Sequence, residues 1–265
     1  MNSLRDSYKI YRKSKKSSAI IYVVLRTLVL LCMIVQIVRG EFENAFMCLL
    51  SLVLLFLPIF FQQKFKIELP NLLEGTIFFF IFSATILGEI YNFYGDVPHW
   101  DTLLHTINGF LCAGFGFALV DLLNKNSERI NLTPFYTAFV AFCFSMTVGV
   151  CWEFFEYGVD TLMDKNTQKD ALVATVVSPY LNPDGNKSVI VRDINKTILY
   201  DLEDNELGIV NGGYLDIGLH DTMKDLLVNF IGAVAFSTFG YFYIKNRDKY
   251  KFTNNFIPKR ISSEN

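Results

Sequence analysis

Long apolar runs alternate with short polar links along most of the chain. An α-helix needs about 20 apolar residues to cross a bilayer core of roughly 30 Å. Six runs approach or exceed that length, at residues 19–38, 45–61, 71–91, 101–123, 134–157 and 221–244. A polar stretch at 158–219 separates the last two runs. The pattern predicts six transmembrane helices with a long loop before the sixth.

Composition agrees with a membrane protein. The residues are 52% hydrophobic and 19% charged, whereas a soluble chain carries about 25% charged residues. The fold class that we expect is therefore an all-α membrane protein. The cysteines all lie inside apolar runs, which favours buried thiols over a disulfide framework or a cysteine-based metal knuckle. They are Cys32, Cys48, Cys112, Cys143 and Cys151.

Lysine and arginine are distributed unevenly among the links. The arm at 1–18, the second and fourth links and the tail are basic, while the first and third links are poor in bases. The positive-inside rule then places both termini in the cytoplasm of a plasma (inner) membrane and the long loop outside it. A basic arm suits an anionic lipid surface, and no signature of nucleic-acid binding appears.

Small residues indicate which helices pack closely. Helices three to six carry pairs of small residues four positions apart, which let helix backbones approach each other in lipid. These pairs are Ala84/Gly88, Gly109/Ala113, Cys112/Gly116, Ser145/Gly149 and Ala233/Ser237. We therefore expect a basic arm (1–18), two peripheral helices (19–68), three core helices (69–157), an extracytoplasmic loop (158–219), a core sixth helix (220–246) and a basic tail (247–265).

The long loop differs in character from the rest of the chain. Residues 189–199 alternate apolar and polar positions, which predicts a short hairpin. Asn182-Pro183-Asp184-Gly185 predicts a turn, and Gly212-Gly213 permits tight turns before helix six. We expect a small β-containing cap between helices five and six, and a plain solvated loop is the alternative.

Polar residues gather at the ends of four predicted helices. They are Glu89 at the end of helix three, His99, Asp101 and His105 at the start of helix four, Glu153 and Glu156 at the end of helix five, and His220, Asp221, Asp225 and Asn229 at the start of helix six. The predicted topology places all of them at one depth near the outer surface. Because ionisable groups inside a membrane are costly and commonly functional, we expect one shared polar site.

The residue types favour a metal ion in that site. Clustered carboxylates repel one another unless a cation or shared protons relieve the repulsion. Mixed imidazole and carboxylate ligands suit Zn²⁺, Mn²⁺ or Fe²⁺, whereas carboxylates alone suit Mg²⁺ or Ca²⁺. The metal ligands that we expect are His99, Asp101, His105, Asp221 and Asp225. The expected catalytic bases are Glu153 and Glu156, and the other polar residues of the site are Glu89, His220 and Asn229.

Three short motifs carry a family resemblance. Asp101-x3-His105 opens one helix, Glu153-x2-Glu156 ends the next, and Asp225-x3-Asn229-x2-Gly232 lies in the last. This pattern resembles the VanZ-like membrane proteins, and it is closer still to inner-membrane proteins of the YjdF type. Glu156 stands where the VanZ-like pattern has Gln, and the link before helix six is longer. The resemblance implies an envelope-associated protein, since VanZ-like members are linked to glycopeptide resistance.

Two functions remain open at this point. One is an outward-facing site that binds a metal and the head group of an envelope lipid or lipid-linked precursor, with hydrolysis or group transfer as the expected reaction. The other is a non-enzymatic scaffold or a small transporter. A structural role for single residues is also open, because Asp101 and Asp221 are well placed as helix N-caps.

Overall fold

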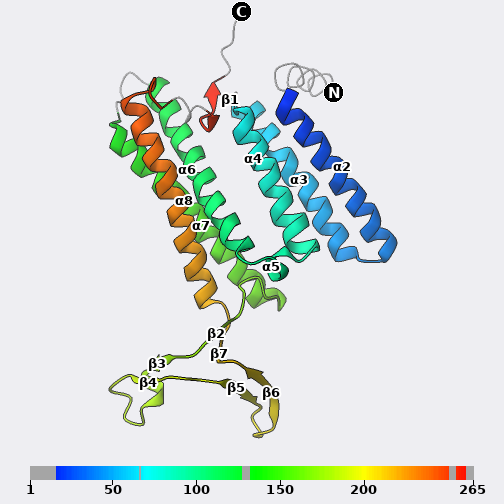
Figure 1. Cartoon of the computed structure of the whole chain (residues 1–265), viewed down its shortest axis with the longest axis vertical. Coiled ribbons are helices and arrows are strands. Elements are labelled where there is room, and N and C mark those ends of the chain that lie inside the picture. The colour runs from blue at the N-terminus through cyan, green and yellow to red at the C-terminus, as the bar shows by residue number, and fades with distance from the viewer. Residues whose placement is uncertain (1–15, 66, 127–131, 251–254, 261–265) are drawn as a thin grey trace, which may run out of the picture. The chain divides into compact units, whose positions relative to one another are not determined.

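The structure, a computed structural model, describes residues 16–65, 67–126, 132–250 and 255–260. Most of the predicted basic arm and parts of the fourth link and of the tail lie outside these residues. The longer helical elements are α2 (Lys16–Arg39), α3 (Phe42–Phe65), α4 (Asn71–Phe82), the π-helix η1 (Ser83–Ile90), α5 (Phe93–Asp96), α6 (Trp100–Asn126), α7 (Pro134–Met163) and α8 (Leu219–Lys245) (Figure 1).

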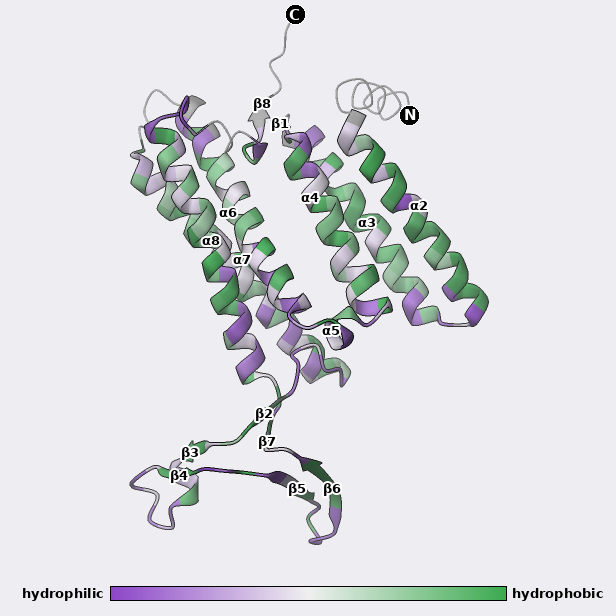
Figure 2. Cartoon of the chain, in the orientation of Figure 1, coloured by the Kyte–Doolittle hydropathy of each residue, from purple (hydrophilic) through white to green (hydrophobic). Residues whose placement is uncertain are grey.

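Six helical spans are long and apolar enough to cross a membrane, within the part of the chain that the structure describes. They are α2, α3, α4 joined to η1, α6, α7 and α8. Figure 2 shows that hydrophobic residues dominate these spans, while the first turns of α8 are hydrophilic. The predicted all-α fold with six spans is confirmed.

The third span changes its helical type partway. The α-helix α4 continues directly into η1, which ends before Asn92, a residue with left-handed backbone at φ 54°. A Cβ atom on Gly88 would collide with the ring of Tyr94, so η1 packs closely against α5. Glu89 lies exposed on η1. The wider π-turn is a change in hydrogen bonding that hydropathy does not reveal.

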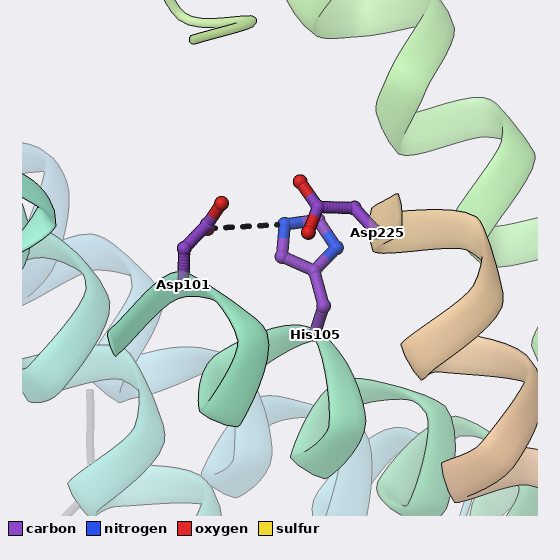
Figure 3. A group of neighbouring side chains, drawn as sticks. All are labelled: Asp101, His105 and Asp225. Carbon is purple, nitrogen blue, oxygen red and sulfur yellow. Dashed lines mark ion pairs between the residues drawn. The ribbon is translucent and has the colours of Figure 1, made fainter. Parts of the chain in front are cut away.

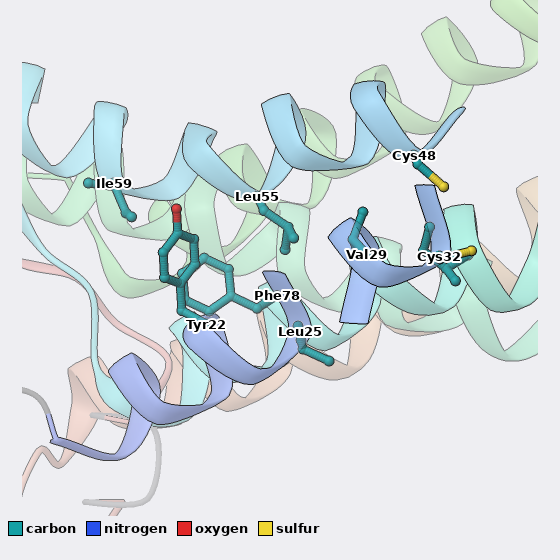
Figure 4. Packing of buried hydrophobic residues seen from close by; sticks show 9 residues of the cluster. Tyr22, Leu25, Val29, Cys32, Cys48, Leu55, Ile59 and Phe78 are labelled. Carbon is teal, nitrogen blue, oxygen red and sulfur yellow. The ribbon is translucent and has the colours of Figure 1, made fainter. Parts of the chain in front are cut away.

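Residues of α2, α3, α4 and η1 form one buried apolar cluster, which Figure 4 shows in close view. The rings of Tyr22 and Phe78 lie 5.2 Å apart in it. Polar bonds also join α3 to the third span, since Gln62 Nε2 donates to Glu74 Oε1 at 2.6 Å. The third span also packs against α6, where Leu111 lies against the buried cluster that contains Leu73. The expected division into two peripheral and four core helices stays a prediction.

The helices α6, α7 and α8 share a second buried cluster. Phe110 and Phe117 of α6 pack edge-on against Phe236 of α8, with ring centroids 5.0 Å and 5.9 Å apart. Glycines bring the backbones together, because a Cβ atom on Gly109 would meet the carbonyl of Asn229. The expected close packing through small residues is confirmed at this contact.

Two further contacts join distant parts of the sequence. The short strand β1 (Ile67–Glu68) pairs antiparallel with β8 (Lys259–Arg260). Arg247 Nη2 donates to Asp121 Oδ1 at 2.9 Å, and the Asp121 side chain is buried. The ion pair connects the end of α6 to the residues after α8.

The chain divides into two compact units, one with the residues up to Gly149 and from Leu227 onward, the other Val150–Leu226. The second unit contains three two-stranded antiparallel sheets, β2–β7, β3–β4 and β5–β6. Their strands are β2 (Ala171–Val173), β3 (Val176–Ser178), β4 (Val189–Val191), β5 (Lys196–Tyr200), β6 (Glu206–Asn211) and β7 (Tyr214–Asp216), with the 3-10 helix η2 (Pro179–Leu181) after β3.

The loop is thus β-containing, as expected, but its strand pairing differs from the prediction. The strand β4 pairs with β3 and β5 pairs with β6, so residues 189–199 do not form a hairpin. Alternation of side chains specifies a strand but not its partner. The predicted turn is confirmed, because the N–H of Gly185 donates to the carbonyl of Asn182 at 3.0 Å.

Candidate metal site

The first two turns of α6 carry two of the predicted ligands. His99 precedes the helix in a left-handed conformation, with φ 62°, and its side chain is exposed. Asp101 and His105 lie one turn apart, as their spacing predicts, with His105 Nε2 3.4 Å from Asp101 Oδ1. His105 is 9% exposed. The imidazole is therefore held beside a carboxylate in a nearly water-free position.

A buried amide lies where α6, α7 and α8 approach one another closely. Asn229 of α8 is 1% exposed, and its Oδ1 accepts a hydrogen bond from Asn108 Nδ2 at 3.3 Å. Side chains on Gly109 of α6 and Gly149 of α7 would both collide with it. Ser145 Oγ of α7 donates to the carbonyl of Gly109 at 2.7 Å. These contacts set the register of α6, α7 and α8.

The residues one helical turn from Gly109, Gly149 and Asn229 lie on the same helix faces as these three residues. Residues four positions apart on an α-helix share a face. His105 lies four positions before Gly109, Glu153 four after Gly149, and Asp225 four before Asn229. The helices α7 and α8 are continuous through these positions. Glu153 therefore lies on the same face of α7 as Gly149, and Asp225 lies on the same face of α8 as Asn229.

Two sets of potential ligand atoms meet the distance required for one metal ion. The atoms of Asp101, His105 and Asp225 lie within 4.8 Å of one another, and so do those of His105, Glu153 and Glu156. Figure 3 shows the first set, with the imidazole of His105 beside both carboxylates. Asp225 and Glu153 are 1% and 4% exposed. His105 is common to both sets and is the centre of the candidate site.

Within the described residues, two predicted ligands, His99 and Asp221, and two further predicted polar residues of the site, Glu89 and His220, lie outside these two sets. His220 is exposed, and its backbone N–H donates to Asp216 Oδ2 at 2.9 Å. Asn229 contributes to helix packing. The two sets together comprise Asp101, His105 and Asp225, which were predicted as ligands, and Glu153 and Glu156, which were predicted as catalytic bases.

Asp221 has a hydrogen-bond partner within its own unit, Val150–Leu226. Its Oδ2 accepts a hydrogen bond from the N–H of Lys169 at 2.8 Å, and Gln168 Nε2 donates to Thr222 Oγ1. Asp160 accepts from the N–H groups of Thr167 and Gln168, at 2.6 Å and 2.8 Å. These bonds hold the end of α7 against the beginning of α8. The sequence provides no periodic signal for Gln168, because it lies outside any helix.

A lysine that sequence reasoning missed lies beside the carboxylates of α8. Lys224 Nζ is 3.6 Å from Asp221 Oδ1 and 3.9 Å from Asp225 Oδ1. The lysine side chain is 47% exposed, so water screens its charge. In the sequence, the spacing of three residues between Asp221 and Lys224 was the signal for this ion pair. Lys224 is therefore a solvent-screened cationic partner of Asp221 and Asp225.

Comparison with known proteins gives a family but no characterised activity. A family described as "Predicted membrane protein (DUF2238)" matches residues 20–246. An uncharacterised protein of Thermotoga maritima is 28% identical over 115 residues, which cover 43% of this chain and 58% of that protein. The chain thus matches little more than half the length of this relative. No solved structure matches the chain.

Proposed function

Because the chain belongs to the DUF2238 family of predicted membrane proteins, we propose that it binds a divalent cation through His105 and the carboxylates around it, and through that ion the polar head group of a membrane lipid or lipid-linked envelope precursor. The face of the membrane at which the site opens is part of the proposal: it is the outer one, with both termini in the cytoplasm of the inner membrane.

The observation that carries the proposal is the position of His105 in both ligand sets. Imidazole and carboxylate together are ligands typical of Zn²⁺ and Mn²⁺, and Mg²⁺ accepts the carboxylates. A buried imidazole next to Asp101 also follows a general pattern, in which a carboxylate orients a metal-ligating histidine. Three separate helices contribute the five side chains, which supports a built site over a chance capping interaction.

The site supports hydrolysis or group transfer as its reaction class. A bound cation polarises a phosphoryl or carbonyl oxygen and lowers the pKa of bound water. Glu153 and Glu156 are one turn apart on α7, so one can ligate the ion while the other accepts a proton. The six spans favour a substrate with a lipid anchor, because it reaches the site from within the membrane plane.

Metal content of the purified protein tests the first part of the proposal. The protein is purified with an affinity tag free of histidine, and bound metal is measured by inorganic mass spectrometry after dialysis against Zn²⁺, Mn²⁺ or Mg²⁺. We expect one ion per chain and its loss in His105→Ala. His220→Ala is the matched control, since His220 is exposed and belongs to neither ligand set. A wild-type protein that binds none of the three ions disproves the metal site.

Lipid binding and topology test the second part. Native mass spectrometry of the metal-loaded protein should retain anionic or phosphorylated lipids that His105→Ala loses. A scaffold or transporter predicts instead that lipid retention and cellular function are unchanged in Glu153→Gln. For orientation, Asn186→Cys in the exposed turn should react with a membrane-impermeant maleimide in intact cells. Labelling only after lysis would overturn the outward-facing site.

A further inference from the structure

The strand-rich segment at 171–216 lacks a buried core of its own. Within the described residues, none of its side chains belongs to the three buried apolar clusters. Its sheets each contain two strands, and an isolated two-stranded sheet is marginally stable in water. Leu202 and Tyr180 are almost fully exposed, at 105% and 97%. The segment therefore presents apolar side chains and strand edges that a partner can cover.

The strand β5 has an edge available for further pairing. It pairs with β6 on one side, with Lys196 opposite Asn211 and Ile198 opposite Ile209. In a two-stranded sheet the other edge of each strand carries N–H and C=O groups outside the ladder. Leu199 and Tyr200 on β5 are 47% and 56% exposed. Such an edge can accept an additional strand by β-augmentation.

Charge is segregated along the chain on either side of this strand. Residues 187–200 contain three bases, Lys187, Arg192 and Lys196, and one carboxylate, Asp193. Residues 201–206, which follow β5 directly, contain four carboxylates and no base. The strand thus runs from a basic beginning to an acidic end. When two copies of such a strand are aligned antiparallel, the basic beginning of each lies beside the acidic end of the other.

We propose that β5 pairs antiparallel with β5 of a second copy of this chain, about a two-fold axis near Ile198. An isologous contact places the same surface of each copy against the other. In this arrangement Lys196 of each copy lies opposite Tyr200 of the other and next to its Asp201. The ladder is short, so the contact is a small interface that forms in a concentration-dependent manner.

A lipid surface is a less suitable cover for the same segment. The carboxylates of Asp201, Glu203 and Asp204 surround the most exposed apolar residue, Leu202. An anionic membrane surface attracts bases and repels carboxylates. A second copy satisfies the basic and the acidic ends together, whereas such a membrane attracts only the basic one.

Disulfide cross-linking of the full-length protein in membranes tests the pairing. Ile198 would lie opposite itself across the axis, at a Cα separation of about 4.5–5.5 Å that a disulfide can bridge. We expect Ile198→Cys to form a covalent dimer on mild oxidation. Val177→Cys is the matched control, because Val177 is an exposed residue in the neighbouring sheet. Equal cross-linking of the two variants, or none at Ile198→Cys, would overturn the proposal.

Charge reversal separates specific pairing from random collision. In the Ile198→Cys background, Lys196→Glu should reduce the cross-linked dimer about two- to fivefold, because it places a carboxylate opposite Tyr200 and next to Asp201 of the other copy. An unchanged yield would contradict the pairing, and so would protection of the Ile198→Cys thiol by anionic lipid in nanodiscs that hold a single chain. The readout involves no metal, so its failure leaves the metal site of α6, α7 and α8 unaffected.

Discussion

The amide of Asn229 occupies the space that a side chain on Gly149 would need, since a Cβ atom there would lie 2.6 Å from Asn229 Nδ2. Glu153 lies one helical turn beyond Gly149, and Asp225 one turn before Asn229. The contact therefore sets the register of the two helices that carry buried carboxylates of the candidate site.

Substituting Gly149 should affect both stability and metal binding. We expect Gly149→Ala to destabilise the fold by about 1–3 kcal/mol, because an added methyl group overpacks a tight contact. It should also weaken metal binding, since α7 and Glu153 shift with it. Thermal unfolding in detergent and metal titration measure the two effects. Gly158→Ala on the same helix is the control, because no atom lies within 4 Å of its Cβ position. Equal effects of the two substitutions would contradict the packing role.

Removal of the metal should lower the stability of the wild-type protein. A ligand at about 100 times its Kd stabilises the folded state by about 2.7 kcal/mol. We therefore expect a higher thermal midpoint with saturating Zn²⁺ or Mn²⁺ than after treatment with a chelator. The difference should vanish in His105→Ala and persist in His220→Ala. A midpoint that does not respond to any ion in the wild-type protein would count against the site.

Asp101 should tune the affinity for the metal through His105. Loss of a carboxylate that orients a ligating histidine costs about 10- to 100-fold in metal affinity. We expect a loss of this size for Asp101→Asn, measured by competition with a fluorescent chelator. Asp221→Asn should retain the affinity, because Asp221 belongs to neither ligand set and accepts a hydrogen bond from Lys169. An equal loss in the two variants would show that the ligand set is drawn wrongly.

The turn between β5 and β6 should loosen in acid. Asp201 accepts hydrogen bonds from the side chain and backbone N–H of Asn205 and from the N–H of Glu203, at 2.9, 2.8 and 2.8 Å. These bonds, that of the Asn205 side chain foremost, hold the pKa of Asp201 below its usual 3.8. Because the folded pKa is the lower one, the stabilisation is present above pH 3.8 and is lost as the pH falls through the folded value.

Hydrogen exchange of the Asn205 amide, followed across this pH range, measures the loosening. Protection should fall on acidification in the wild-type protein. In Asp201→Asn the acceptor remains but does not titrate, so the same step should be missing. If protection of the Asn205 amide fell equally in both proteins, the fall would belong to a titrating group other than Asp201.

Local periodicity explains what could be predicted of the site. The spacing of Asp101 and His105 placed them on one helical face, and the structure brings them to 3.4 Å. The apolar lengths predicted six spans correctly. His99 and Asp221 were also predicted ligands, and neither of the two ligand sets includes them, so their role as ligands stays a prediction. His99 precedes its helix in a left-handed conformation, and Asp221 bonds to Lys169.

Contacts between distant segments could not be predicted in the same way. The grouping of α4 with α2 and α3 depends on pairs such as Gln62 with Glu74, whose partners lie on different helices. The apolar faces of these helices have similar compositions, so hydropathy does not distinguish a face toward lipid from one toward another helix. The pairing of β4 with β3 and of β5 with β6 also escaped prediction, since alternation is the same for every partner.

The sequence by itself determined the number of spans and the small residues at helix contacts, because these depend on length and on helical period alone. Tertiary structure decided which of the polar residues meet. Gly109, Gly149 and Asn229 set the register of three helices by steric fit. Two candidate ligand sets share His105. Steric fit of this kind depends on which helices are neighbours, and a linear pattern of hydrophobic and polar positions does not contain that information.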